Sequence, residues 1–231
     1  MKCNKLIRIL TIALSIGVMV DASALGLPKF GGSDDSADTS NAETMDSVIA
    51  QQDSLVKTYQ LSMGDILSAQ ALLLEAHGMK EKAAKVASEA EVLGKGAVDK
   101  NEFEKIMELS ESANEDLSKK MGEEEALTSD GRKMYQEALL PYASGIGKMA
   151  QLKPELEKFM QSASAQVKSA SMMSKLKVKK KLDVGMYLAT KAPGYFTNVA
   201  STTKEILTYA NKQGVSEQST GKLTKMLGMS I

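Results

Sequence analysis

Hydrophobic side chains recur at steps of three and four residues along most of the chain after residue 42. This spacing places them on one face of a helix, as in the segment from Met45 to Leu73, where Gln52 and Gln70 share that face. No alternating run of about five or more apolar and polar residues between turn residues indicates a strand. The pattern predicts an all-α protein, a single-domain antiparallel bundle of about six to seven helices after a signal peptide and a flexible N-terminal arm.

Capping residues and glycines predict where the helices begin and end. The sequence from Ser40 to Glu43 has the capping-box pattern, so the first helix is expected to start there, and Gly78 is expected to end it. The next helices predicted in this way cover 79–93, Asp99–Gly122 with a second capping box over Asp99–Glu102, and a segment that starts from a cap at Thr128 or Ser129.

Three prolines predict further boundaries. Pro141 lies inside a helical pattern, where it removes one backbone hydrogen bond and clashes with the preceding turn, so a kink or break is expected near Leu140. Pro154 suits the first residue of another helix, and Pro193 is expected to precede the last long helix. The remaining apolar stripes run over Leu156–Met173 and Val178–Ala189, either joined or separate, and over a short final segment with Leu223, Met226 and Leu227.

The first residues have the order of a secretory signal peptide. Basic residues up to Arg8 precede the apolar run Ile9–Val20, and small residues follow it. An uncleaved membrane anchor is the alternative, but a span needs about 20 apolar residues. We expect residues 1–24 to be a signal peptide that is cut after Ala24, with Ala22 as a second candidate site. The protein is then exported, to the periplasm or alternatively to the extracellular medium.

The segment after the signal peptide is polar and rich in glycine. Residues 25–41 are therefore predicted to be a flexible linker, followed by a helical bundle domain over residues 42–231. Cys3 precedes the apolar run, where the lipid-bearing cysteine of a lipoprotein would not lie. The processed chain would contain no cysteine, so its stability must come from apolar burial instead of disulfides.

Composition argues against most kinds of catalysis. The 231 residues include 29 basic and 29 acidic side chains, one histidine, one cysteine and no tryptophan, so few groups suit metal, haem or thiol chemistry. His77 is expected to be structural, at the C-terminal end of the first helix, where a protonated imidazole would interact well with the helix dipole. We predict no catalytic, cofactor-binding or metal-binding residue, and no cofactor.

One glycine-containing segment superficially resembles a phosphate loop. The residues from Gly145 to Lys148 lack the spacing of that loop and a preceding strand. We expect Gly145 and Gly147 to permit close helix packing instead. Serines are numerous, but Glu75, the carboxylate near the single histidine in sequence, is expected on a different face of the helix, so a serine nucleophile is not expected either.

Charge is unevenly distributed along the chain. The third predicted helix and its exit are acidic, whereas a basic stretch extends from Lys168 to Lys181. The alternatives for this stretch are an ordinary solvated face and a surface that binds an anionic membrane, lipopolysaccharide or an acidic protein. Nucleic acid is not expected, because no aromatic residue is interleaved with the lysines. The candidate contact residues for an anionic surface are Lys175, Lys177, Lys179, Lys180 and Lys181.

Methionine is the one compositional excess, with 15 residues. Its flexible side chain suits an adaptable apolar groove, but it also fills gaps in a helical core. We therefore predict an exported, non-enzymatic binding protein that engages a protein partner through a helix face or groove. The alternative is a carrier of a lipid or another apolar small molecule in the bundle interior.

Overall fold

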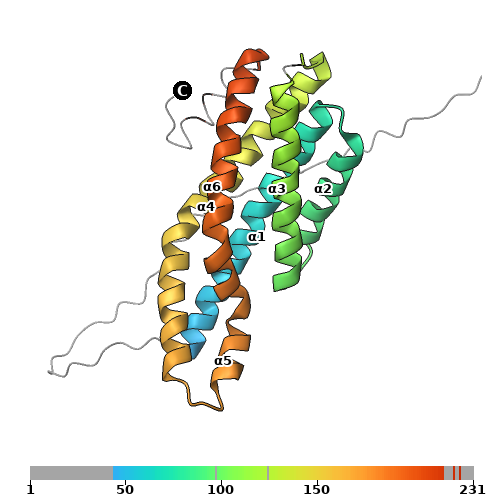
Figure 1. The fold of residues 1–231 in the computed structure, drawn as a ribbon. Helices are drawn as coiled ribbons and strands as arrows, with labels where there is room; N and C mark the ends of the chain where they lie inside the picture. Colours follow the sequence, from blue (N-terminus) through green and yellow to red (C-terminus); the bar gives the residue numbers. More distant parts are fainter. Residues whose placement is uncertain (1–43, 97, 124, 216–220, 222–223, 225–231) are drawn as a thin grey trace, which may run out of the picture. The chain divides into compact units, whose positions relative to one another are not determined.

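The computed structural model describes residues 44–96, 98–123, 125–215, 221 and 224. This part of the chain is a bundle of α-helices without a strand, which confirms the predicted fold class (Figure 1). The predicted signal peptide, the linker over 25–41 and the final segment with Leu223, Met226 and Leu227 lie outside the described residues. The helices are α1 (Met45–Ala76), α2 (Lys80–Leu93), α3 (Lys100–Gly122), α4 (Ser129–Ser169), α5 (Lys175–Lys181) and α6 (Asp183–Lys212).

Of the two residues that bound α1, Gly78 at its end was predicted and Thr44 at its start was not. The helix begins at Met45, because the Thr44 hydroxyl accepts a hydrogen bond from the backbone N–H of Ser47 at 3.3 Å. The start that we expected at Ser40–Glu43 falls outside the described residues. At the other end, Gly78 has a φ of +76° and its N–H donates to the carbonyl of Glu75. Gly78 therefore ends the helix in the left-handed conformation, as predicted.

Two other helix starts were also predicted correctly. In α3, the Asp99 side chain accepts from the N–H of Glu102 and the Glu102 side chain accepts from the N–H of Asp99, both at 2.9 Å. This reciprocal pair is the predicted capping box. In α4, the Thr128 hydroxyl accepts from the N–H of Gly131 at 3.0 Å, so Thr128 is the cap.

The helix breaks and helix starts predicted at prolines are wrong, whereas the kink that was the alternative to a break near Leu140 stays a prediction. Helix α4 continues through Pro141 and Pro154, and α6 continues through Pro193. Each proline removes one backbone hydrogen bond, but buried side chains lie on both sides of it, such as Leu139 and Tyr142 around Pro141. The stability gained when these turns pack against other helices outweighs the loss of one backbone hydrogen bond. The predicted fourth and fifth helices are consequently one helix.

A real interruption occurs where no proline or glycine lies. Helix α4 ends at Ser169, and Ala170 adopts an extended backbone with φ −65° and ψ 141°. A short connection leads from there to α5. Met173, which we assigned to an apolar stripe, lies in this connection with 90% of its surface exposed, so that assignment is wrong.

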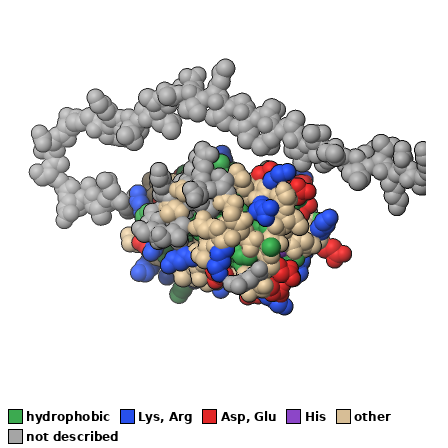
Figure 2. Space-filling model, turned by 90° about the horizontal axis from the view of Figure 1, so that it is seen from above, with side chains coloured by type: hydrophobic (Ala, Val, Ile, Leu, Met, Phe, Trp, Pro, Cys, Tyr) green, Lys and Arg blue, Asp and Glu red, His purple; other side chains and the backbone are tan. Residues whose placement is uncertain are grey.

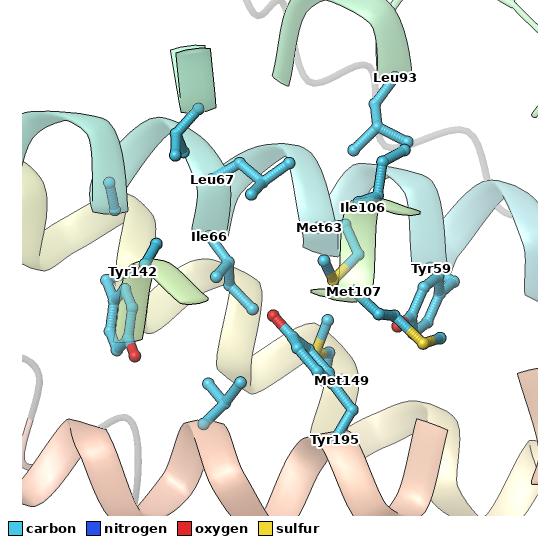
Figure 3. Close-up of a cluster of buried hydrophobic side chains, with 14 of the residues drawn as sticks. Tyr59, Met63, Ile66, Leu67, Leu93, Ile106, Met107, Tyr142, Met149 and Tyr195 are labelled. Carbon is cyan, nitrogen blue, oxygen red and sulfur yellow. The ribbon is translucent and has the colours of Figure 1, made fainter. Parts of the chain in front are cut away.

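Helix α1 lies at the centre of the packing and contacts α2, α3, α4 and α6. Tyr59, Met63 and Ile66 of α1 meet Met107 of α3 and Met149 of α4 in one cluster of buried side chains (Figure 3). Some methionines therefore fill the core, which is one of the two roles that we considered for them.

Close approach of α1 and α4 depends on Gly145. A Cβ atom added there would lie 2.7 Å from the backbone oxygen of Ser62 and 2.6 Å from Cγ1 of Ile66. The same addition at Gly147 would meet nothing within 4 Å. The predicted role in helix packing is thus correct for Gly145 and wrong for Gly147.

A polar cluster crosses the core between α1, α3 and α6. The Gln70 amide donates to the carbonyl of Ser110 at 3.0 Å and to the side chain of Asn114 at 2.8 Å. The Ser110 hydroxyl donates to the Gln70 side-chain oxygen at 2.9 Å and shares a further hydrogen bond with the Tyr195 hydroxyl. Gln70 is fully buried, so these bonds satisfy a group that would otherwise destabilise the core.

Candidate interaction surface

The structure places all five candidate lysines on one short helix. Helix α5 is the seven-residue segment KLKVKKK. Its lysines are exposed except for Lys175, which is half-buried. We call residues 168–181 the α4–α5 corner; it comprises the end of α4, the connection and α5. Figure 1 shows it at one end of the bundle.

The corner is attached to the bundle mainly at its last residues. Val178 is half-buried, and Leu182, which follows α5, is fully buried. Gln52 of α1 reinforces this attachment, because its side-chain amide donates to the carbonyl of Lys181 and its side-chain oxygen accepts from the N–H of Gly185, both at 2.9 Å. Gln52 therefore fixes the junction between α5 and α6.

Three large hydrophobic side chains project from the corner into solvent. Met172 is 88% exposed, Met173 is 90% exposed and Leu176 is 78% exposed. Elsewhere in the described chain the exposed large hydrophobic residues are Leu61, Val92 and Leu140, at 42% to 57%. Sequence reasoning missed the exposure of this group. The available signal was the pair of methionines between two serines, a segment in which a helix need not continue.

Positive charge at the corner is not neutralised by ion pairs within the part of the chain that the structure describes. The ion pairs found there join other lysines to carboxylates, for example Lys82 to Asp116 and Lys148 to Asp65, each at 2.6 Å. Asp183 is the acidic residue next to the corner in sequence. By contrast, the end of the bundle at which α6 ends has interspersed basic and acidic side chains (Figure 2). Within residues 168–181 themselves, every charged side chain is a lysine.

The surroundings of His77 correct one sequence expectation. His77 is the C-terminal cap residue of α1, as predicted, and its ring lies 5.2 Å from that of Tyr209 and 6.0 Å from that of Tyr135, between centroids. Burial, followed by the nearby charge of Lys120, lowers the pKa of His77. These effects outweigh the expected interaction of a protonated imidazole with the helix dipole, so this environment favours the neutral ring.

A hollow of about 430 Å³ lies beside His77 and is partly lined by Glu75, Glu125 and Met134. The Nε2 atom of His77 is buried and has no hydrogen-bond partner among the described residues.

Two further observations concern metals and membranes. Nowhere in the described ranges do three or more His, Cys, Asp or Glu side chains group in a way that would hold a metal ion. None of the helices over residues 44–96, 98–123 and 125–215 combines the length and the apolar character of a membrane span.

Comparison of the chain with models of protein families, with curated proteins and with solved structures gave no match.

Proposed function

We propose that this chain is an exported, non-enzymatic binding protein whose contact surface is the α4–α5 corner and whose partner carries negative charge. One observation carries the proposal: the lysines of α5 are held together on a short helix without an ion pair to any described residue. The whole chain has a formal net charge of zero, so this positive region is a local feature. Such a region attracts an anionic surface over a Debye length of about 8 Å at physiological salt.

Export is supported by the residue order of positions 1–24, in which basic, apolar and small residues follow one another. We propose the periplasm as the destination and the extracellular medium as the alternative. An antiparallel bundle is part of the same proposal. It is supported by the contacts of α4 with α1, because Gly131 approaches Ala76 whereas Gly145 approaches Ile66.

The packing of the interior supports binding at the surface over transport of an apolar molecule inside the bundle. Tyr59, Met63, Ile66, Tyr142 and Tyr195 come from three helices and are almost completely buried between them (Figure 3). Side chains packed in this way leave no room for a lipid chain without separation of the helices. Native mass spectrometry of the purified protein tests the carrier alternative, since a co-purifying apolar ligand would support it.

Charge reversal at the corner tests the proposed contact surface. The variant Lys179→Glu, Lys180→Glu, Lys181→Glu concentrates the change on α5. A matched control, Lys57→Glu, Lys85→Glu, Lys105→Glu, changes the net charge by the same amount at exposed positions of α1, α2 and α3.

We expect the corner variant to elute from a heparin column at clearly lower salt than both the control and the native chain. Far-ultraviolet circular dichroism checks that all three chains are folded. Equal elution of the two variants would contradict the proposal, because retention would then depend on net charge and not on the corner.

A further inference from the structure

We propose that the α4–α5 corner binds the surface of an anionic lipid bilayer, with Met172, Met173 and Leu176 inserted at the boundary between headgroups and acyl chains. The α5 lysines then lie at the level of the lipid phosphates. This inference rests on the proposed function, from which it takes the corner as the contact surface. It adds the chemical nature of the partner and a separate role for the apolar side chains.

The three apolar side chains lie within a span of five residues at the corner. Met172 and Met173 lie in the connection where the chain leaves α4, and Leu176 lies in the first turn of α5. They are the three most exposed large hydrophobic residues of the described chain. Because water contact of such side chains is unfavourable, a group of them at one projecting point indicates a surface that receives them.

The side chains of α5 point in two directions, toward the bundle and away from it. Val178 and Leu182 lie one turn apart and pack toward the bundle. Leu176 lies on another face, which it shares with Lys179 and Lys180 at helical spacings of three and four residues. Apolar and basic side chains therefore project together from the side of α5 that faces away from the core.

The small size of the corner favours a bilayer over an acidic protein surface. An acidic protein surface would satisfy the lysines, but a stable protein interface buries about 1,200 Å² or more, usually around a fitted core. The corner is small: it consists of the end of α4, a short connection and a seven-residue helix at one end of the bundle (Figure 1). A fluid bilayer accepts isolated apolar side chains at any position and supplies a dense layer of phosphates above them. Flexible methionine side chains adapt well to such an environment.

A second copy of the chain is the remaining alternative occupant. The outer face of α3 carries exposed carboxylates that would complement the lysines of another molecule. They are Glu104, Glu108 and Glu115. That arrangement gives the exposed methionines no apolar partner, so the bilayer accounts for more of the observations.

The test uses the full chain and compares two matched sets of substitutions. The corner variant is Met172→Gln, Met173→Gln, Leu176→Gln, which leaves every lysine in place. The control variant replaces the other exposed large hydrophobic residues and is Leu61→Gln, Val92→Gln, Leu140→Gln. Binding is measured by cosedimentation with vesicles of phosphatidylglycerol and phosphatidylcholine, and with vesicles of phosphatidylcholine alone.

We expect the corner variant to bind the phosphatidylglycerol vesicles at least about tenfold more weakly than the control, since three apolar side chains no longer leave water. Each lysine that is neutralised should weaken binding by about fivefold. Heparin retention of the glutamine variant should stay at the native value. Equal vesicle binding by the corner variant and the control would overturn insertion and leave the proposed contact surface intact.

A local probe reports insertion independently of any binding by residues 1–24. In a Cys3→Ser background, an environment-sensitive fluorophore is attached through Met172→Cys or, as the control site, through Val92→Cys. We expect a blue shift with phosphatidylglycerol vesicles only for the probe at position 172. No shift there would overturn the inference, as would equal binding to vesicles of phosphatidylcholine alone. Another outcome is that the chain fails to bind vesicles and self-associates instead. If reversal of the lysine charges then abolishes the self-association, the partner of the corner is a second copy of the chain and not a bilayer.

Discussion

The substitution Gly145→Ala tests the packing of α1 against α4 at their closest point. The added Cβ would lie 2.7 Å from the backbone oxygen of Ser62, whereas ordinary contacts between non-bonded heavy atoms lie at about 3.5–4.0 Å. Ile66 can adjust its side chain, but the Ser62 oxygen moves only with the backbone of α1. The two helices would therefore have to separate locally, by about 1 Å on that comparison.

The size of the effect follows from two opposing contributions. Overpacking of a core costs about 1–3 kcal/mol, while replacing glycine by alanine inside a helix contributes up to about 1 kcal/mol of stability. Gly147→Ala is the matched control, because an added Cβ meets nothing there within 4 Å and only the helical gain applies. The helical gain is common to both variants, so we expect Gly145→Ala to unfold with a free energy about 1–3 kcal/mol lower than that of Gly147→Ala.

Urea unfolding followed by far-ultraviolet circular dichroism measures this difference, since the chain has no tryptophan to serve as a fluorescent probe. The dependence of the free energy on urea should be the same for both variants if the surface exposed on unfolding is unchanged. Equal midpoints for the two variants would refute the reasoning, because they would mean that α1 and α4 do not approach closely at Gly145.

Other predictions concern ionisation and hydrogen bonding. Because the pKa of His77 is lower in the folded chain than its usual value of 6.5, folding stability should fall as the pH drops from 6.5 toward the folded-state pKa. Urea midpoints measured against pH should show this loss in the native chain and a smaller one in His77→Asn; identical profiles would contradict it. Gln52→Ala should lower the free energy of unfolding by about 1–3 kcal/mol, since the buried N–H of Gly185 loses its partner; an unchanged urea midpoint would refute this. Burial raises the pKa of Tyr142 and Tyr195, so the phenolate absorbance that is lost in Tyr142→Phe or Tyr195→Phe should appear only together with alkaline unfolding; its appearance in an earlier transition would count against their burial.

The parts of the fold that sequence reasoning predicted correctly depend on neighbouring residues. The capping box of Asp99 and Glu102 and the left-handed Gly78 each involve backbone groups within a few positions, so the residues themselves specify the geometry. Helical periodicity is local in the same sense. It identified Gln52 and Gln70 as members of a buried face, although it did not show which groups they would bond.

The errors at prolines have a different origin. A proline inside a helix costs about 3 kcal/mol, and whether a helix forms despite this depends on burial of its two flanking turns. For Pro193 those turns include Ala192 and Tyr195, both buried against other helices. That burial exists only in the folded bundle. The local sequence shows that a proline destabilises the helix, but it does not show the contacts that compensate. Sequence reasoning therefore predicted a boundary there.

The interruption at Ala170 shows why the corner could be predicted only in part. The last buried residue of α4 is Ala163; after it, Val167 is half-buried and the other residues of the helix are small or polar. Without burial, extending the helix further would add little stability. Helix α4 therefore ends here although no proline or glycine interrupts it. Helix α5 also contains no fully buried residue and depends on Leu182 and Gln52 for its position. The corner thus contributes little to the core, so the core does not explain why its lysines and methionines lie together. Contact with another surface, which we propose to be an anionic bilayer, does explain it.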